Sequence, residues 1–258
     1  MQAMNWCYWL IAVAVLIGSC GSTFDATGRT PREIFDHAVA AFNDGDLYEA
    51  QRLFDVIRLQ YPASEFAPDA QYYLAEISFR RREYVVASFN YSMVRRQYPT
   101  HPRAREALYK AALCYVELAP PYDRDQEYTR KAIAALQDFI REYPQDSLAR
   151  EAERQIRRLR NQLAQRELSI AEQYRVLRSP QSALIYYDAV LDEYGDTDAV
   201  EGAFVGKVEV LLELGRYDEA LSTCVLYRQL FPNGALRERI EQLREQIPAR
   251  GARAGGSP

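Results

Sequence analysis

The sequence has little of several residue types that mark large classes of protein. Its 258 residues include only 12 glycines and 12 prolines, whereas a turn-rich β protein needs many more. Only three of its 32 cationic residues are lysines, and 36 acidic residues bring the net charge to −4. This near-neutral balance excludes a dedicated nucleic-acid binder, which carries a strong basic excess. A hydrophobic fraction of 48% with 26% charged residues is typical of a folded chain rather than a disordered one.

Residue patterns of known catalytic and metal sites are also missing. The sequence contains no Gly-x-x-x-x-Gly-Lys-Ser/Thr, His-Glu-x-x-His, Cys-x-x-Cys or Gly-x-Ser-x-Gly motif. The two histidines, His37 and His101, are far apart and have no acidic or thiol cluster beside them. The acids between Asp192 and Asp198 have the wrong spacing for a calcium loop. We therefore expect a protein that is not an enzyme and that holds no metal or cofactor.

The first twenty residues have the pattern of an export signal. Trp6–Ile17 is an unbroken apolar run, and as a helix it would rise about 18 Å, short of the roughly 30 Å core of a bilayer. Its length suits a signal peptide. The following segment, Leu16–Cys20, resembles the bacterial lipobox, in which an aliphatic residue and two small residues precede a cysteine. That resemblance implies a signal peptide over 1–19, lipidation of Cys20 and a lipidated tether over 20–30; a buried helix ending in Gly-Ser-Cys is the alternative.

A repeat runs through the rest of the chain. Aromatic-proline pairs recur, with Tyr194-Gly195 in one of the five places: Tyr61-Pro62, Tyr98-Pro99, Tyr143-Pro144, Tyr194-Gly195 and Phe231-Pro232. Twelve places before each Pro or Gly stands an alanine: Ala50, Ala87, Ala132, Ala183 and Ala220. Eight places before stands a larger apolar residue: Phe54, Tyr91, Leu136, Tyr187 and Cys224. A small and a larger apolar residue at fixed places match the tetratricopeptide pattern of about 34 residues. The small residue is needed because two antiparallel helices approach closely only at small side chains.

The repeat predicts an all-α fold, a tetratricopeptide-repeat solenoid of about five helix pairs with a C-terminal capping helix. Each Pro should end a second helix, and Gly45 and Gly215 should each end a first helix. The solenoid should occupy 31–247. Its expected repeats are about 31–62, 66–99, 103–144, 164–195 and 198–232. Three further segments have their own predictions: an insertion at 119–125, an extra or extended helix at 147–162 and a cap at 235–246. The last residues, 248–258, are small, basic and Gly-rich, and we expect them to be disordered.

Two cysteines, Cys114 and Cys224, fall in this repeat region. They lie in repeats three and five, and a repeat contacts only its neighbours. We therefore expect them to be too far apart for a disulfide and to act as buried apolar side chains.

The near-neutral total hides an uneven distribution of charge. The segment from Arg80 to Lys110 contains eight basic residues and two acidic ones. The segment from Asp188 to Glu219 contains ten acidic residues and two basic ones. Such runs either are solvated helix faces or favour two different partners.

Aromatic residues fall at the places that line the groove of a tetratricopeptide array. In the first helices of repeats one and two these residues are Phe35, Phe42, Tyr72 and Phe79, and Arg80 follows the last of them. Such a groove suits an extended peptide that carries aromatic side chains. The alternative is that the rings only cover neighbouring helices.

A lipobox followed by five such repeats resembles the BamD family, the lipoprotein subunit of the machinery that inserts β-barrels into the bacterial outer membrane. The similarity is clearest in the insertion Asp123-Arg124-Asp125, in Tyr143–Ser147 and in the run Leu159–Tyr174. The resemblance implies a scaffold without catalysis, anchored through Cys20 at the periplasmic face of the outer membrane of a Gram-negative bacterium.

The resemblance also implies partners. The C-terminal repeats would dock on the barrel-forming subunit, in the company of accessory lipoproteins. The groove at Phe35, Phe42, Tyr72, Phe79 and Arg80 would receive the C-terminal strand of an unfolded client barrel. The alternative is another tetratricopeptide lipoprotein adaptor of the cell envelope, serving division (Tol-type) or secretin assembly (pilotin-type).

Overall fold

The computed structural model describes residues 24–248. The expected signal peptide, the lipidation site Cys20 and all but the first residue of the expected tail lie outside this range. The chain divides into two compact units between Arg103 and Ala104, and each is described by itself.

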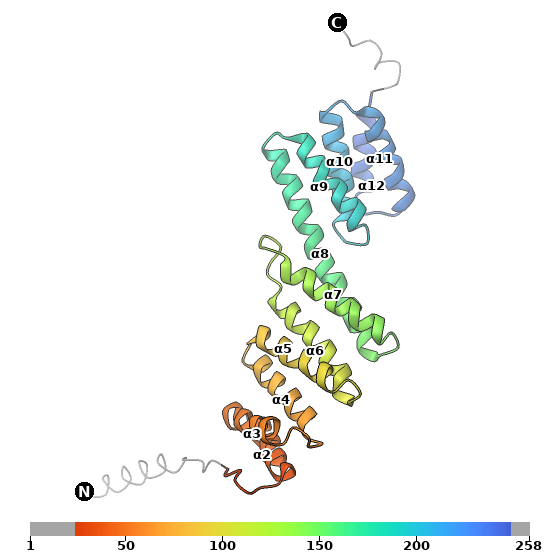
Figure 1. The fold of residues 1–258 in the computed structure, drawn as a ribbon. Coiled ribbons are helices and arrows are strands. Elements are labelled where there is room, and N and C mark those ends of the chain that lie inside the picture. Colours follow the sequence, from red (N-terminus) through yellow and green to blue (C-terminus); the bar gives the residue numbers. More distant parts are fainter. Residues whose placement is uncertain (1–23, 249–258) are drawn as a thin grey trace, which may run out of the picture. The chain divides into compact units, whose positions relative to one another are not determined.

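The first unit consists of two helix pairs (Figure 1). They are α2 (Pro31–Asn43) with α3 (Leu47–Gln60) and α4 (Ala67–Arg80) with α5 (Tyr84–Gln97). These pairs occupy the residues expected for repeats one and two. The capping box of Thr30 and Glu33 begins α2, with each side chain bonded to the backbone of the other residue.

The second unit contains the remaining helices, of which α6 begins two residues before the boundary. They are α6 (Pro102–Leu118), α7 (Glu127–Glu142), α8 (Ser147–Val176), α9 (Pro180–Glu193), α10 (Val200–Glu213), α11 (Tyr217–Leu230) and α12 (Arg237–Glu245). The segment 147–162 is the first half of the 30-residue helix α8, which continues without a break into repeat four. The short α12 contacts α10 and α11.

The repeat pattern corresponds to the core. The described residues contain helices and no strand, so the all-α tetratricopeptide prediction is confirmed. All five alanines of the repeat and all five larger residues that follow them are fully buried. The aromatic residue of each pair caps its helix, and its N–H donates to the carbonyl four residues earlier. The small and large positions therefore form the contact between paired helices.

The turn inside four of the five pairs contains a residue in the left-handed conformation. Gly45 and Gly215 have φ of +84° and +68°. In repeats two and four the same place is taken by Arg82 and Arg178, with φ of +61° and +54°. This conformation costs a residue with a Cβ roughly 1–2 kcal/mol. The turns of repeats two and four therefore keep the same geometry although arginine disfavours it.

Helix α10 lies close to a side chain of α9 at a glycine. A Cβ added at Gly206 would lie 2.3 Å from Cζ of the fully buried Tyr187. One turn earlier in the same helix, a Cβ at Gly202 would lie 3.5 Å from Leu168 Cδ2, an ordinary contact. Packing therefore requires glycine at position 206 but not at position 202.

Gly206→Ala is expected to destabilise the second unit by about 1–3 kcal/mol, the usual cost of overpacking, since the Tyr187 ring must move. Gly202→Ala in the same helix is the matched control and should stabilise by up to about 1 kcal/mol, because alanine favours helix. Urea unfolding followed by circular dichroism measures both, and equal effects of the two substitutions would contradict the assignment.

Candidate binding site

The predicted groove residues belong to a layer of aromatic contacts in the first unit. Phe35 is half-buried, and its ring centroid lies 5.0 Å from that of Phe66 and 6.0 Å from that of Tyr73. Phe42 is buried, with its ring 5.0 Å from Tyr73. The guanidinium carbon of Arg80 lies 3.7 Å from the Phe42 centroid, and Arg80 also donates to the Phe42 carbonyl at 3.0 Å. Arg80 therefore covers Phe42, which is a cation–π contact.

The other two predicted rings have different neighbours. Tyr72 is buried, with Tyr91 at 5.6 Å and the Arg103 guanidinium at 4.6 Å. Phe79 is half-buried and lies 5.3 Å from Tyr84.

Other side chains of the first unit cover Phe42 and Tyr72, which leaves them little surface for a ligand. Phe35, Phe79 and Arg80 are the predicted groove residues that keep solvent-exposed surface.

Tyr73 joins these rings, and the sequence analysis missed it. Besides Phe35 and Phe42, it stacks on Phe54 at 4.9 Å with an interplanar angle of 1°. Tyr73 follows Tyr72 in the sequence and is not at one of the repeat positions that line a groove, so the repeat pattern did not predict a role for it. The aromatic layer thus depends on a residue outside the groove pattern.

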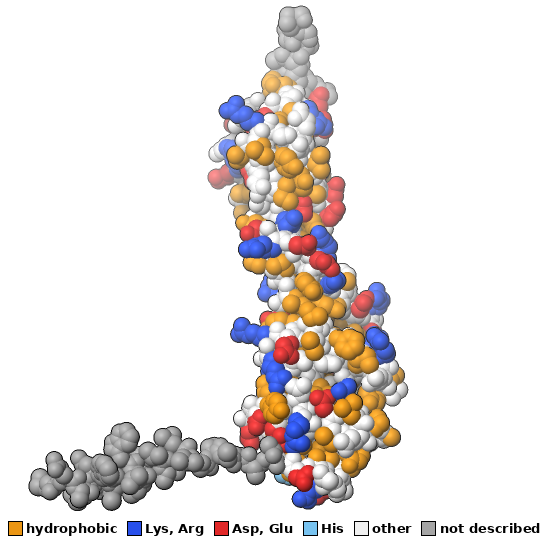
Figure 2. Space-filling view, turned by 60° about the vertical axis from the view of Figure 1, so that its left-hand side comes forward, with side chains coloured by type: hydrophobic (Ala, Val, Ile, Leu, Met, Phe, Trp, Pro, Cys, Tyr) orange, Lys and Arg blue, Asp and Glu red, His pale blue; other side chains and the backbone are white. Residues whose placement is uncertain are grey.

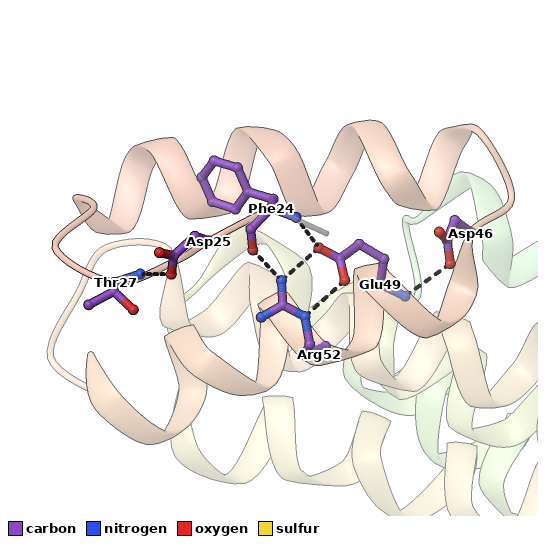
Figure 3. Close-up of polar contacts among 6 residues, drawn as sticks. All are labelled: Phe24, Asp25, Thr27, Asp46, Glu49 and Arg52. Atoms are coloured by element: carbon purple, nitrogen blue, oxygen red, sulfur yellow. Dashed lines mark hydrogen bonds and ion pairs between the residues drawn. The ribbon is translucent and has the colours of Figure 1, made fainter. Parts of the chain in front are cut away.

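The end of the expected tether is held on repeat one (Figure 3). We call residues 24–28 the N-terminal strap. The Phe24 N–H donates to Glu49 Oε1 at 3.3 Å, and Arg52 donates to the Phe24 carbonyl at 2.6 Å. Arg52 also binds both carboxylate oxygens of Glu49, at 2.7 and 2.8 Å. The Phe24 ring stacks on His37 at 3.8 Å. Both backbone polar groups of Phe24 and its ring are thereby bound.

Two further carboxylates, those of Asp25 and Asp46, fix the backbone of the strap and the start of α3. Asp25 accepts from the Thr27 N–H at 2.9 Å, which turns the strap, and Asp46 accepts from the Glu49 N–H at 3.0 Å, which caps α3. The bond from Arg52 lowers the pKa of Glu49. Glu49 is therefore a charged acceptor, which strengthens its bonds to the strap.

Two arginines of other helices offset part of the acidic stretch in the second unit. Glu209 accepts from Arg175 at 2.8 Å and from Arg239 at 2.5 Å, and its side chain is mostly buried. Asp188 pairs at 2.6 Å with Lys207, one of the two basic residues of the stretch itself. The two arginines make the local field weaker than the sequence count indicates.

Buried tyrosines anchor two helices of this unit through carboxylates. Tyr187 donates to Glu172, and Tyr227 donates to Glu201 at 2.5 Å. Burial raises the pKa of both phenols, that of Tyr227 to about 12. Glu201 also accepts from the Leu236 N–H at 3.0 Å, which fixes the entry to α12.

The two thiols, Cys114 and Cys224, are buried and are not joined in a disulfide. Burial raises the pKa of Cys224 to about 11, which makes it a poor nucleophile.

The insertion in repeat three is clamped onto α8. The amide nitrogen of the buried Gln126 donates to the carbonyls of Pro121 and Arg124, at 2.8 and 3.0 Å. From α8, Gln162 donates to Gln126 Oε1 at 3.0 Å and Arg166 donates to the Arg124 carbonyl at 2.6 Å. The insertion is therefore a fixed part of the surface.

The part of the chain seen in the structure brings together no group of three or more His, Cys, Asp or Glu side chains suited to a metal ion. Within residues 24–248, no helix is both long and apolar enough to cross a membrane.

Comparison with known proteins identifies the family. The model of the YfiO family, described as outer membrane lipoprotein, matches residues 28–225. The chain belongs to this family. Among curated relatives, the outer membrane protein assembly factor BamD of Caulobacter vibrioides is 28% identical over 73% of this chain and 62% of its own length. BamD of Rickettsia prowazekii is 24% identical over 87% of this chain and 90% of its own length. BamD of Pasteurella multocida is 22% identical over 84% and 88% of the two chains.

Similarity extends to a solved structure, a thermophilic TPR protein of Thermus thermophilus. It is 22% identical with a TM-score of 0.36, and the match covers 83% of this chain and 98% of that one.

The strap should depend on Arg52. Arg52→Gln removes the bond to the Phe24 carbonyl and the partner of Glu49, so amide exchange of residues 24–30 should become at least about tenfold faster, corresponding to roughly 1.4 kcal/mol. Arg58→Gln is the matched control, because Arg58 forms a similar pair with Asp55 on the same helix, at 2.7 Å, without touching the strap. Because the pKa of Glu49 is lowered in the folded state, its contribution is present above the ordinary carboxyl pKa and is lost as the pH falls through the lowered value. Exchange in this segment that is unaffected by Arg52→Gln would contradict the assignment.

Proposed function

We propose that this chain is a lipid-anchored scaffold subunit of the outer-membrane β-barrel assembly complex, without catalytic activity. The family match over residues 28–225 carries this proposal, since the curated relatives named above are outer membrane protein assembly factors. The fold supports it as well, because paired helices with a packed interior offer extended surfaces rather than an enclosed reaction site.

The anchor in this proposal is Cys20, at the periplasmic face of the outer membrane of a Gram-negative bacterium. Two or more acyl chains, such as diacylglycerol with an added palmitate, make such anchoring stable where one chain is marginal. The strap supports this role, because it fixes the chain to repeat one only a few residues after the cysteine.

The second unit is the proposed docking surface for the barrel-forming subunit, with accessory lipoproteins nearby. Helix α11 exposes Val225, Leu226 and Leu230, with 43%, 46% and 58% of their surfaces accessible. Around them lie ion-paired side chains such as Arg228 with Glu241, at 3.2 Å. An apolar centre with a polar rim is the usual composition of a protein interface.

The first unit is the proposed site for unfolded client barrels. Phe35 and Phe79 offer ring surface, and Arg80 offers a guanidinium that can bind a carboxylate. The buried Phe42 lies under the Arg80 guanidinium, and the buried Tyr72 packs against Tyr91 and Arg103. A C-terminal client segment with an aromatic residue and a free carboxylate fits this set.

Affinity capture tests the docking proposal. A tagged chain solubilised from outer membranes should recover the barrel-forming subunit, and Leu226→Ser with Leu230→Ser should reduce recovery at least about tenfold, because burial of a leucine contributes roughly 1.5–3 kcal/mol. Leu59→Ser, a change of the same kind on α3 in the first unit, is the control and should leave recovery unchanged. Failure of the unaltered chain to recover the barrel-forming subunit would overturn the proposed function.

Peptide binding tests the client site. Phe35→Leu with Phe79→Leu keeps apolar volume but removes both rings, and should weaken binding of a peptide with a C-terminal aromatic about 5–30-fold, as loss of 1–2 kcal/mol does. The control is Phe231→Leu, a half-buried aromatic of the second unit. Fluorescence anisotropy gives the affinities, and circular dichroism checks that each variant is folded. Equal affinities for the double variant and the unaltered chain would show that the peptide binds elsewhere.

A further inference from the structure

Helix α5 exposes an apolar surface that the described chain leaves uncovered. Val85, Val86 and Phe89 have 58%, 50% and 59% of their surfaces accessible, and Tyr48 at the start of α3 has 76%. Single exposed apolar residues are normal on a soluble protein, whereas a group of four on one region indicates a contact surface. Figure 2 shows one face of the molecule, where apolar side chains reach the surface among charged ones.

These four residues form one region because the turn before α5 is tied to α3. Arg81 donates to the side-chain oxygen of Gln51 at 2.5 Å and to the Leu47 carbonyl at 3.1 Å. Gln51 and Val86 also line the same hollow between the two helices. Tyr48 stands three places before Gln51 and seven before Asp55, which also lines this hollow, so it shares their face of α3.

Cations lie at both ends of this region. Arg81 and Arg82 precede α5 and Arg96 lies in its last turn, and all three are exposed. Within residues 24–248 none of the three forms an ion pair, since both bonds of Arg81 go to neutral oxygens. Glu83 offsets one of the three charges. The helix therefore presents apolar side chains between unneutralised arginines, the pattern of a helix that lies in the boundary between headgroups and acyl chains.

The strap holds the expected lipid close to α3. Glu49 and Arg52, which bind Phe24, lie on the same helix as Tyr48 and Gln51. Three residues separate Cys20 from Phe24, so their Cα atoms lie at most about 14 Å apart. A membrane that holds the lipid on Cys20 can therefore contact the exposed side chains of α3 and α5.

We propose that this region rests on an anionic phospholipid surface. We call it the α5 face; it comprises Tyr48, Arg81, Arg82, Val85, Val86, Phe89 and Arg96. The apolar side chains enter the acyl boundary, and the guanidinium groups bind headgroup phosphates. The assignment goes beyond the proposed function, because it gives the first unit a membrane contact of its own and so sets which side of repeat two faces the bilayer.

Vesicle flotation without the lipid anchor tests the proposal. A chain that begins at residue 20 and carries Cys20→Ala retains every described residue. It should float with vesicles of phosphatidylethanolamine and phosphatidylglycerol, and the bound fraction should fall with added salt. Val85→Ser with Phe89→Ser should lower the partition coefficient at least about tenfold. Arg82→Gln with Arg96→Gln should abolish the preference for these vesicles over phosphatidylcholine alone.

Ile185→Ser is the matched control. Ile185 on α9 is 66% exposed and stands ten places before Gly195, as Phe89 stands ten places before Pro99, so it occupies the same place in another repeat. This control should float like the parent. Circular dichroism should show the same helix content for every variant.

Two outcomes would overturn the proposal: a parent chain that does not float with anionic vesicles, and an apolar double variant that floats as well as the parent. Either outcome would leave the α5 face as a surface for a protein partner. Both are independent of acylation and of capture of the barrel-forming subunit, so the proposal and the proposed function can fail separately.

Discussion

Close approach of two antiparallel helices at a small side chain is the contact on which the rest of the structure depends. The five alanines of the repeat carry no accessible surface, and each is followed one helical turn later by a fully buried larger residue. A larger side chain at the small place would push the helices apart and expose the large residue beside it. At Tyr187 even a methyl group on the facing helix is too much, because the ring lies against the backbone of Gly206. Helix ends, caps and surface charges vary between repeats, whereas this contact recurs in every pair.

The sequence predicted the parts of the fold that follow from this contact. The all-α fold with its buried small and large positions and the helix ends at the aromatic-proline pairs could be read from spacing. Spacing also predicted a helix over 147–162, but left open whether it was an extra helix or, as the structure has it, part of a longer one. The left-handed turns at Arg82 and Arg178 could not, because arginine gives no signal for positive φ. Their geometry comes from the helices on either side.

Long-range pairing limited what could be predicted about the sites. The charge count of Asp188–Glu219 ignored Arg175 and Arg239, which reach Glu209 from helices outside that stretch. The groove pattern identified Phe42 and Tyr72 but not the depth at which they are buried, since Arg80, Tyr73 and Arg103 cover them in three dimensions. The sequence predicts a tether over 20–30 and gives no sign of the strap, because Glu49 and Arg52, the partners of Phe24, come 25 and 28 residues later. The client site at Phe35, Phe79 and Arg80 and the anchor at Cys20 remain proposals.

Helix α8 gives the second unit a mechanical property. Its 30 residues rise about 45 Å without interruption. One part of it holds the insertion of repeat three through Gln162 and Arg166, and its last turn binds Glu209 of α10 through Arg175. A continuous helix resists bending far more than a helix pair joined by a turn resists opening. A force applied to the insertion is therefore transmitted along a single rod to the contact with α10, and the two places are displaced together rather than independently.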